Sequence, residues 1–281
     1  MRTLTIKSEN GSSIKISKSN PYVLQQLEGT GVPKSSKETV KAPNQDGSTH
    51  INTTFDDRDL DIKFAILESD FPSLYVLKEE VCKTLNPKYT LDILYEYPGG
   101  KKRIKGVLDG EVDFPEGDMI GYQEAKFSIE CSNPFWLDDE PSGEKLAVSK
   151  PTFRFPLIFS PNITFSVILN KTIKINVKGH VEVPIVIKFN GPALNPVVKN
   201  LTTNKFIKVE KELYVGEVLE IRTEKGNKSV MINGENAFGF IDLDSELFYL
   251  NPGENIITYD ADSGSESAEV SLTYTNRYVG V

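Results

Sequence analysis

Apolar and polar residues alternate in short runs along most of the chain, which is typical of half-buried β-strands. In the clearest run, residues 59–67, the apolar Leu60, Ile62 and Phe64 alternate with Asp, Lys and Ala. Similar runs occupy residues 4–7, 13–16, 90–97, 125–131, 183–189, 218–223, 230–233 and 268–274. Asp-Gly and Asn-Gly pairs separate several runs and supply the positive φ angles that tight hairpins require. The sequence therefore predicts a mostly β protein.

One segment follows a different period. Between residues 72 and 85, Leu74, Leu77, Val81 and Leu85 recur at helical spacing, and an Asn-Pro pair follows that would end a helix. We predict a single α-helix that packs on a sheet.

Residues 28–52 are polar, rich in Gly, Ser, Lys and Thr, and bounded by better-patterned strands. This composition predicts an extended arm or a long hairpin with its tip near Asp46 and Gly47. Because such an arm buries little of itself, ordering it makes most sense on a neighbouring copy of the chain. Passing an arm from each subunit to the next closes into a ring, with Pro33, Pro43, Asp46 and Gly47 as candidate contacts.

The length of 281 residues exceeds one ordinary core and favours two domains. The boundary falls where Asn133, Pro134, Phe135 and Trp136 precede an acidic segment with Pro, Gly and Ser, so these four residues form the predicted domain junction. We assign residues 1–140 to a ring-forming first domain and residues 141–281 to a second one. Tight turns in the second half predict a compact sandwich that is monomeric by itself.

Net charge narrows the possible partners. The formal charge is -8 and the sequence pI is about 5.1, which argues against binding nucleic acid through its phosphates. A negative surface could still line a channel through which DNA slides. No apolar run reaches the ~18 residues of a membrane span and no secretory leader is visible, so we expect synthesis in cytosol without membrane attachment. Cys82 and Cys131 are expected to be two buried thiols and not a disulfide.

Reactive constellations are missing from the sequence. His50 and His180 are the only imidazoles, and neither lies beside a cysteine or in a paired-histidine pattern. There is no phosphate-binding glycine loop. We therefore predict no enzyme, no catalytic residues and no cofactor.

One acidic pattern imitates a calcium-binding loop, with Asp57, Asp59, Asp61 and Glu68 at the spacing of EF-hand ligands. The position that requires Gly in such a loop is Ile62, and the surrounding alternation predicts an extended strand. We therefore predict no metal site.

Several ordered motifs carry a family likeness. In the first half they are the helix that closes on Asn-Pro, the basic run 101–106 and the Asn-Pro-Phe-Trp segment at 133–136. In the second half they are residues 179–187, 195–204, 213–217, 248–255 and 277–281. In this order the motifs resemble those of siphophage distal tail (Dit) proteins, and the likeness spans nearly the whole chain.

The resemblance implies a first β-sandwich domain with one helix and a projecting hairpin, which forms a homo-hexameric ring at the virion tail tip. It also implies a second, galectin-like or carbohydrate-module-like jelly-roll sandwich. Such a hub joins the tail tube protein to a tail-associated fibre or lysin protein, and in some phages to receptor-binding proteins, while DNA passes the channel. The family offers no catalytic residues to transfer. This chain lacks the large inserted carbohydrate module of some relatives.

A carbohydrate-binding module that contacts cell-wall glycan is the alternative, because the second domain would share the shape of one. Sugar modules present exposed aromatic rings, and the only Trp lies at the predicted junction. Candidate rings in the second half are Tyr214, Phe238, Phe240, Phe248 and Tyr249. Their exposure would separate the two hypotheses.

Overall fold

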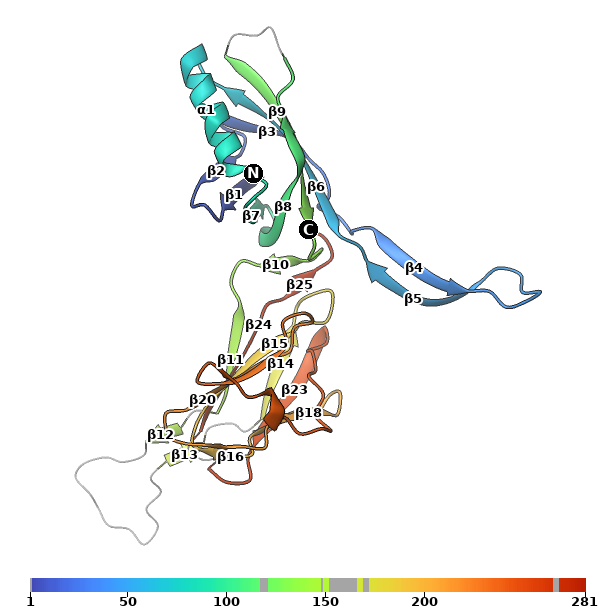
Figure 1. The fold of residues 1–281 in the computed structure, drawn as a ribbon, viewed down its shortest axis with the longest axis vertical. Coiled ribbons are helices and arrows are strands. Elements are labelled where there is room, and N and C mark those ends of the chain that lie inside the picture. The colour runs from blue at the N-terminus through green and yellow to red at the C-terminus, as the bar shows by residue number, and fades with distance from the viewer. Residues whose placement is uncertain (1, 117–120, 148, 152–165, 169–171, 265–267) are drawn as a thin grey trace. The chain divides into compact units, whose positions relative to one another are not determined.

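The computed structural model describes residues 2–116, 121–147, 149–151, 166–168, 172–264 and 268–281. The chain forms two compact units (Figure 1). Unit 1 contains Met1–Asp139 and Tyr278–Val281, and unit 2 contains Glu140–Arg277. Strands dominate both units, so the predicted mostly β fold class is confirmed.

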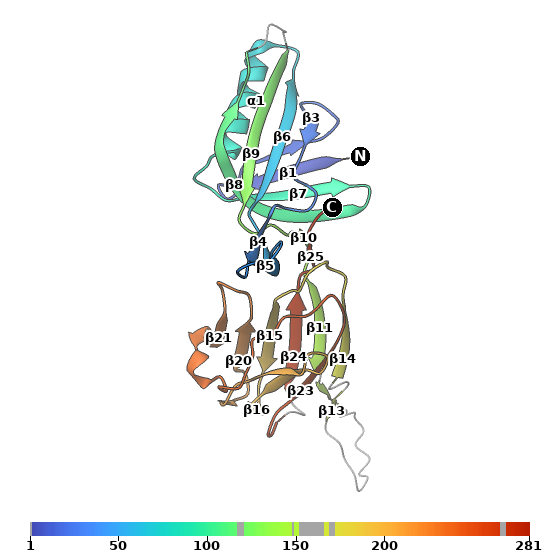
Figure 2. The same cartoon turned by 90° about the vertical axis from the view of Figure 1, so that its right-hand side faces the viewer.

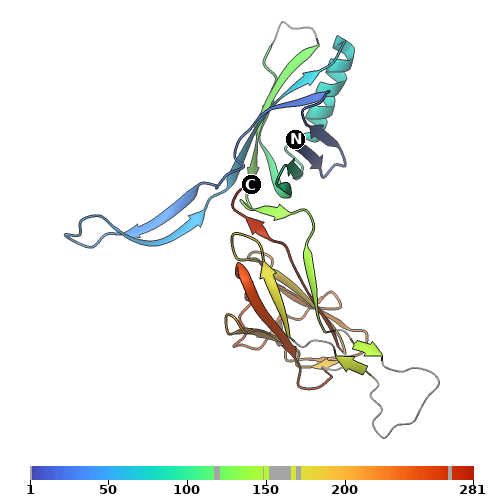
Figure 3. The same cartoon turned by 180° about the vertical axis from the view of Figure 1, so that it is seen from behind.

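Unit 1 is built on one strongly bent antiparallel sheet with the strand order β2-β1-β7-β8-β9-β6-β3. Its elements are β1 (Thr3–Ser8), β2 (Ser13–Ile16), β3 (Tyr22–Leu27), β4 (Ser35–Val40), β5 (Thr49–Phe55), β6 (Arg58–Leu67), α1 (Phe71–Thr84), β7 (Leu91–Tyr97), β8 (Gly100–Asp113), β9 (Tyr122–Cys131) and β10 (Trp136–Asp138). Strands β4 and β5 pair only with each other. They form a hairpin that projects away from the rest of unit 1 (Figures 1 and 3).

The alternation read from the sequence places the core of unit 1. On β6, Leu60, Ile62 and Phe64 are buried, while Asp59 and Asp61 lie on the opposite, accessible face. The long β8 takes part in both halves of the sheet, because its first half pairs with β7 and its second half with β9. The apolar faces of both halves enclose one core.

Helix α1 confirms the helix predicted at residues 72–85. Asp70 caps its N-terminus by accepting a hydrogen bond from Ser73 N at 2.9 Å, and Pro72 stands in the first turn, where it needs no partner. Leu74, Val81 and the C-capping Leu85 are buried against the sheet. It is the one α-helix among the described residues.

The last four residues belong to unit 1, although the sequence analysis assigned them to the second domain. Tyr278 ends the short strand β25 (Arg277–Tyr278), which pairs with β10. The Tyr278 ring receives Lys102 Nζ at 3.8 Å, and Val281 N donates to Thr30 O at 3.0 Å. A return from so distant a point of the chain leaves no signal in local composition.

Unit 2 is a β-sandwich (Figure 2). One sheet has the order β11-β24-β15-β20-β21-β22 and the other β14-β23-β17-β18. The elements are β11 (Ser142–Ala147), β12 (Ser149–Pro151), β13 (Ser166–Ile168), β14 (Thr172–Val177), β15 (Ile185–Asn190), β16 (Ala193–Leu194), β17 (Val197–Asn200), β18 (Lys205–Lys208), β19 (Glu212–Leu213), β20 (Val218–Arg222), β21 (Ser229–Ile232), β22 (Glu235–Asn236), the short 3-10 helix η1 (Phe238–Phe240), β23 (Gly253–Asp260) and β24 (Glu269–Tyr274).

The core of unit 2 fills the space between these sheets. Ile187 and Phe189 from the first sheet meet Ile257 and Tyr259 from the second, and the rings of Phe189 and Tyr259 lie 5.6 Å apart. Each of these side chains is almost wholly buried. Unit 2 therefore has a core of its own, separate from the one in unit 1.

Candidate functional site

The β4–β5 hairpin, here called the arm, is the most unusual feature of unit 1. Every residue of both strands is exposed, including Val40, Ile51 and Phe55. The strands hold each other through an antiparallel register interrupted by a bulge at Ile51. An isolated two-stranded hairpin is marginal in water, so the arm is a segment suited to pairing with another surface.

The structure confirms the predicted hairpin and its tip. Residues 41–48 connect the strands, and Gly47 adopts a φ of 78°, as a tight turn requires. Pro43, Asp46 and Gly47 are exposed at this tip, whereas Pro33 is half-buried where the chain enters the arm. The four residues thus occupy both ends of the arm. Their contact with another copy stays a prediction.

A buried arginine holds the root of the arm. Arg58 begins β6 on its core face and is only 2% exposed. Its guanidinium donates to backbone carbonyls alone: Nε to Pro134 O at 2.7 Å, Nη1 to Gly31 O at 2.6 Å and also to Gly29 O, and Nη2 to Val279 O at 2.8 Å. Burial lowers the pKa of Arg58, because removal from water disfavours the charged form. One side chain therefore fixes three distant segments.

Sequence reasoning missed Arg58, although a signal existed. Arg58 has the same parity as Leu60 and Ile62, which places it on the buried face of the same strand. A cation at such a position requires a dense set of acceptors. Backbone carbonyls supply them here, and no residue type in the sequence marks a carbonyl in advance.

The predicted junction residues also lie beside the arm root. Pro134 gives its carbonyl to Arg58, and the ring of Phe135 packs edge-on against Phe55 at 5.6 Å. Trp136 is wholly buried under the Arg58 guanidinium, 5.9 Å from ring centre to Cζ. Asn133 Oδ1 accepts from Phe135 N at 3.3 Å and shapes the turn between them. These contacts belong to unit 1, and the junction role stays a prediction.

Acidic residues gather on one part of the accessible face of the β8–β9–β6 half of the sheet, whereas farther along Lys63 on β6 stands opposite Lys126 on β9. Asp59 on β6 stands directly opposite Glu130 on β9, and Asp61 shares a row with Ser128 and Asp109. Like charges placed opposite each other destabilise a sheet. Lys34 offsets one of these carboxylates by pairing with Asp59 at 3.0 Å.

The pKa of Glu130 is raised by the other carboxylates of this acidic face. A hydrogen bond shared with the Asp57 carboxyl raises the pKa of Glu130 above its ordinary value, and desolvation and the charges of Asp57, Asp109 and Asp59 act in the same direction. The sheet therefore concentrates negative charge on one face at the expense of its own stability.

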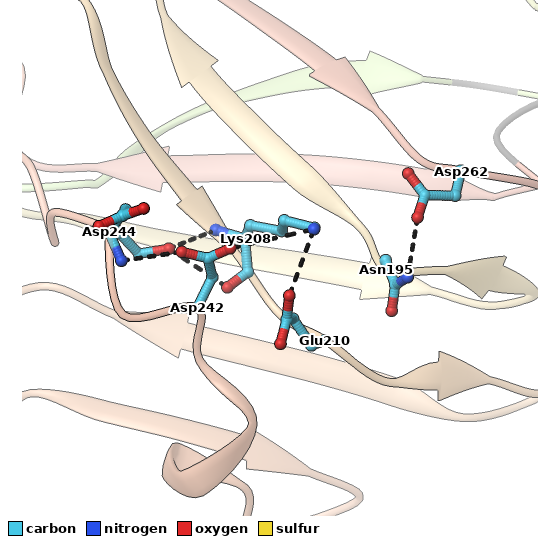
Figure 4. Close-up of polar contacts among 7 residues, drawn as sticks. Asn195, Lys208, Glu210, Asp242, Asp244 and Asp262 are labelled. Carbon is cyan, nitrogen blue, oxygen red and sulfur yellow. Dashed lines mark hydrogen bonds and ion pairs between the residues drawn. The ribbon is translucent and has the colours of Figure 1, made fainter.

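Unit 2 carries a polar cluster at its surface (Figure 4). Lys208 Nζ lies 3.4 Å from Glu210 Oε1 and 3.9 Å from Asp242 Oδ2, and Asp242 Oδ1 accepts from Asp244 N at 2.8 Å. Nearby, Asn195 Nδ2 donates to Asp262 Oδ2 at 2.8 Å. The Lys208–Glu210 and Asp242–Asp244 contacts join residues two positions apart and shape turns, whereas Lys208–Asp242 and Asn195–Asp262 join segments far apart in sequence.

One aromatic residue adjoins this polar cluster, since Glu210 N donates to Phe240 O at 2.7 Å. Phe240 receives Lys211 Nζ at 4.7 Å from its ring centre, and Phe238 and Tyr214 are also exposed. Of the other rings that the sequence offered, Phe248 is buried in the core. Tyr249 is engaged through its hydroxyl, which accepts from Lys225 N at 2.7 Å. Trp136 offers no platform because it is buried.

The structure separates the two cysteines. Cys131 is buried as predicted, and desolvation raises the pKa of its thiol to about 12. Cys82 is exposed, so the prediction that both thiols are buried was wrong. Cys82 follows the buried Val81 on α1, and one residue of a helix turns the side chain by about 100°, away from the sheet.

The strand interpretation of the calcium-like pattern is confirmed. Asp59 and Asp61 project from the extended β6, and Glu68 follows the other end of the strand, about 30 Å from Asp59 at ~3.3 Å per residue. Across the described parts of the chain, no three His, Cys, Asp or Glu side chains are grouped so that they could hold a metal ion. Nor does any helix described here combine the length and apolar character needed to cross a membrane.

Two family models match the chain. Residues 9–131 match the phage tail protein RIFT-related domain, and residues 178–278 match the C-terminal domain of the siphovirus-type tail component. Together the matches cover most of the sequence and fall on the two compact units. No curated protein sequence matches.

Solved structures share the fold over the whole length. The Dit protein (gp 19.1) of phage SPP1, described as a paradigm of the hub adsorption apparatus in phages infecting Gram-positive hosts, has a TM-score of 0.70 at 12% identity, covering 98% of each chain. A chain of the phage P2 baseplate in its activated conformation with Ca has a TM-score of 0.52 at 12% identity, covering 97% of this chain and 98% of that one. The corresponding baseplate with Sr gives the same values. At this identity the likeness shows the fold.

Proposed function

Since the chain belongs to the siphophage distal tail protein family, we propose that it is a structural hub of the tail tip that assembles as a homo-hexameric ring. The ring joins the tail tube protein on one side to the tail-associated fibre or lysin protein on the other. Receptor-binding proteins are further partners that this position allows. The protein would be made in the cytoplasm of the host bacterium and act in the virion, without catalysing a reaction.

The exposed arm carries this proposal. Apart from Phe55, which packs on Phe135 at the root, its two strands are exposed along their length, yet they pair with each other and are anchored at the root by Arg58. A segment with unused backbone edges and exposed Val40 and Ile51 gains most by lying on a neighbour. A contact that passes from each subunit to the next is heterologous and closes into a ring at a suitable rotation.

Deletion of the arm tests the proposal. Residues 35–55 are replaced by Gly-Ser, and the mass of the assembly is measured over a concentration series with wild type in parallel. We expect wild type to approach a hexamer and the deletion to remain a monomer with unit 1 folded. The control variant Leu243→Ser changes a side chain that is 99% exposed in unit 2 and should leave the mass unchanged. A monomeric wild type throughout, or a hexamer without the arm, would contradict the proposal.

We further propose that the acidic face of β8–β9–β6 borders the channel through which DNA passes. Carboxylates repel phosphates within a Debye length of ~8–10 Å, so a duplex would slide without binding. The double variant Asp61→Lys with Asp109→Lys reverses the charge of one row on this face. We expect it to retain duplex DNA at low salt while wild type does not; equal retention by both proteins would contradict the assignment.

A second candidate function is the binding of a cell-wall glycan by unit 2. The supporting observation is the exposure of Tyr214, Phe238 and Phe240, of which Phe240 accepts from Glu210 N at 2.7 Å through its carbonyl, since sugars stack on rings and donate to carboxylates. Binding of the protein to a glycan array that weakens in the Phe240→Ala variant but persists in the Tyr249→Phe variant would support glycan binding by unit 2. A blank array, with the protein folded, would remove it.

A further inference from the structure

The root of the arm is completed by residues from the far end of the sequence. Val281 N donates to Thr30 O at 3.0 Å, and Val279 O accepts from Arg58, 221 positions away in the sequence. Gly280 packs directly on Gly31, where a Cβ added to Gly280 would lie 2.9 Å from the Gly31 carbonyl carbon. Within residues 278–281, here called the return segment, Gly280 and Val281 therefore contact the chain where it enters the arm, and Val279 contacts Arg58, just after the arm.

Few other contacts constrain where the arm points, and one of them is the edge-on packing of Phe55 against Phe135 at 5.6 Å. Near its base, Asp56 N donates to Lys34 O at 3.0 Å, which joins one arm strand to the other and fixes neither to the sheet. The Lys34–Asp59 ion pair is solvent-exposed and therefore contributes little to holding the arm. Arg58 is buried, in contrast, and holds Gly29 and Gly31 on one side and Val279 on the other. The arm entrance and the return segment thus share one anchor.

The order of the segments along the chain means that this anchor is completed late in synthesis. The arm precedes the second unit in sequence, whereas the return segment follows it. During synthesis, the carbonyl of Val279 and the close surface of Gly280 reach the arm root only after unit 2 has been made. Until then, Arg58 lacks one of its acceptors and Gly31 lacks its packing partner.

We propose that the return segment, acting through Arg58 and Gly280, positions the arm, so that the arm takes a single orientation only in chains whose second unit is complete. Gly280 is a positioning residue because only the absence of a side chain allows its contact with Gly31. The inference concerns the single chain and does not rest on ring formation. Its effect is that unfinished chains carry an arm that is not yet set for pairing.

Distance measurements between two spin labels test this on full-length protein. Cys82 on α1 is exposed and accepts one label, the buried Cys131 stays unlabelled, and Lys37→Cys on β4 supplies the second site. In the dilute labelled protein we expect one narrow distance distribution. Gly280→Ala should broaden it, and removal of residues 279–281 or Arg58→Met should abolish the single narrow peak.

A matched glycine variant is the control. At Gly143 an added Cβ would find its nearest atom 4.0 Å away, so Gly143→Ala should leave the distribution unchanged. Trp136 fluorescence reports in each variant whether unit 1 is folded, and Gly280→Ala provides the milder change if the others unfold it.

Two results would overturn the inference: a narrow distribution that survives removal of residues 279–281 in a folded protein, or a broad one already in the parent. A mass measurement on the same samples keeps the two proposals apart. If rings form although the distribution is broad, the inference fails while the proposed hub stands. If the distance distribution is narrow and no ring forms, the proposed hub fails while the inference about the arm stands.

Discussion

Replacing Arg58 by Met should destabilise unit 1 far more than replacing an exposed arginine. Met keeps the length and apolar stem but removes a guanidinium that donates to Pro134, Gly29, Gly31 and Val279. Hydrogen bonds from a charged donor contribute ~1.5–3 kcal/mol each, and carbonyls left unpaired add to the loss. Burying the cation opposes folding, and its removal returns part of that penalty. We therefore expect the free energy of unfolding of unit 1 to fall by about 3–4 kcal/mol.

Urea denaturation followed by Trp fluorescence measures this fall. The sequence has a single Trp, and Trp136 is buried beside Arg58, so the signal reports unit 1 without unit 2. The control is Arg103→Met, which removes half-exposed ion pairs to Asp92 and Asp139 and should cost no more than about 1 kcal/mol. A loss at Arg58 no larger than that of the control would refute the view that this residue holds the unit together.

Four further outcomes are expected. Phe64→Ala should lower the unfolding free energy of unit 1 by about 3–5 kcal/mol, while Phe189→Ala should do the same for unit 2 and leave the Trp136 transition in place. The raised pKa of Glu130 means that the folded state binds its proton more tightly than the unfolded chain; the resulting stabilisation is present below the ordinary pKa of 4.5 and is lost as pH rises through the raised value. Urea midpoints of Glu130→Gln should accordingly exceed wild type at neutral pH and converge with it in acid. A thiol reagent should modify Cys82 alone in the native protein and both cysteines after denaturation, because burial raises the Cys131 pKa to about 12. Chelators and added calcium should leave the thermal midpoint unchanged, since Asp59 and Glu68 lie at opposite ends of one strand; a rise of several degrees with calcium would contradict this.

Local patterns were enough to predict the secondary structure that carries the site. The period of two on β6, the helical spacing before Leu85 and the polar composition of the arm each depend on residues close in sequence, and the structure confirms all three. The alternation also contained the position of Arg58 on the buried face. The alternation did not reveal which backbone carbonyls accept the hydrogen bonds of Arg58.

Contacts over long separations could not be predicted. The return segment contacts the arm root from more than two hundred positions away in the sequence. Gly280 lies so close to the Gly31 backbone that a side chain would clash, and composition does not reveal such a contact. The prediction that Cys82 is buried was wrong because neighbouring positions of a helix face different directions, and Cys82 faces solvent while Val81 faces the sheet. Predicting the acidic face would have required the strand register, which places Glu130 opposite Asp59.

Strand β8 makes unit 1 a single cooperative block. Residues 100–106 pair with β7 and residues 107–109 with β9, and at the crossing a Cβ on Gly106 would lie 2.6 Å from Glu130 O. Neither half of the sheet can open without breaking the strand that the other half shares. We therefore expect the amides of the arm to exchange readily with solvent, and those of the central strands β7, β8 and β9 to exchange only on unfolding of the whole unit. The arm can therefore lose and regain its own strand pairing while its anchored root and the sheet behind it stay closed.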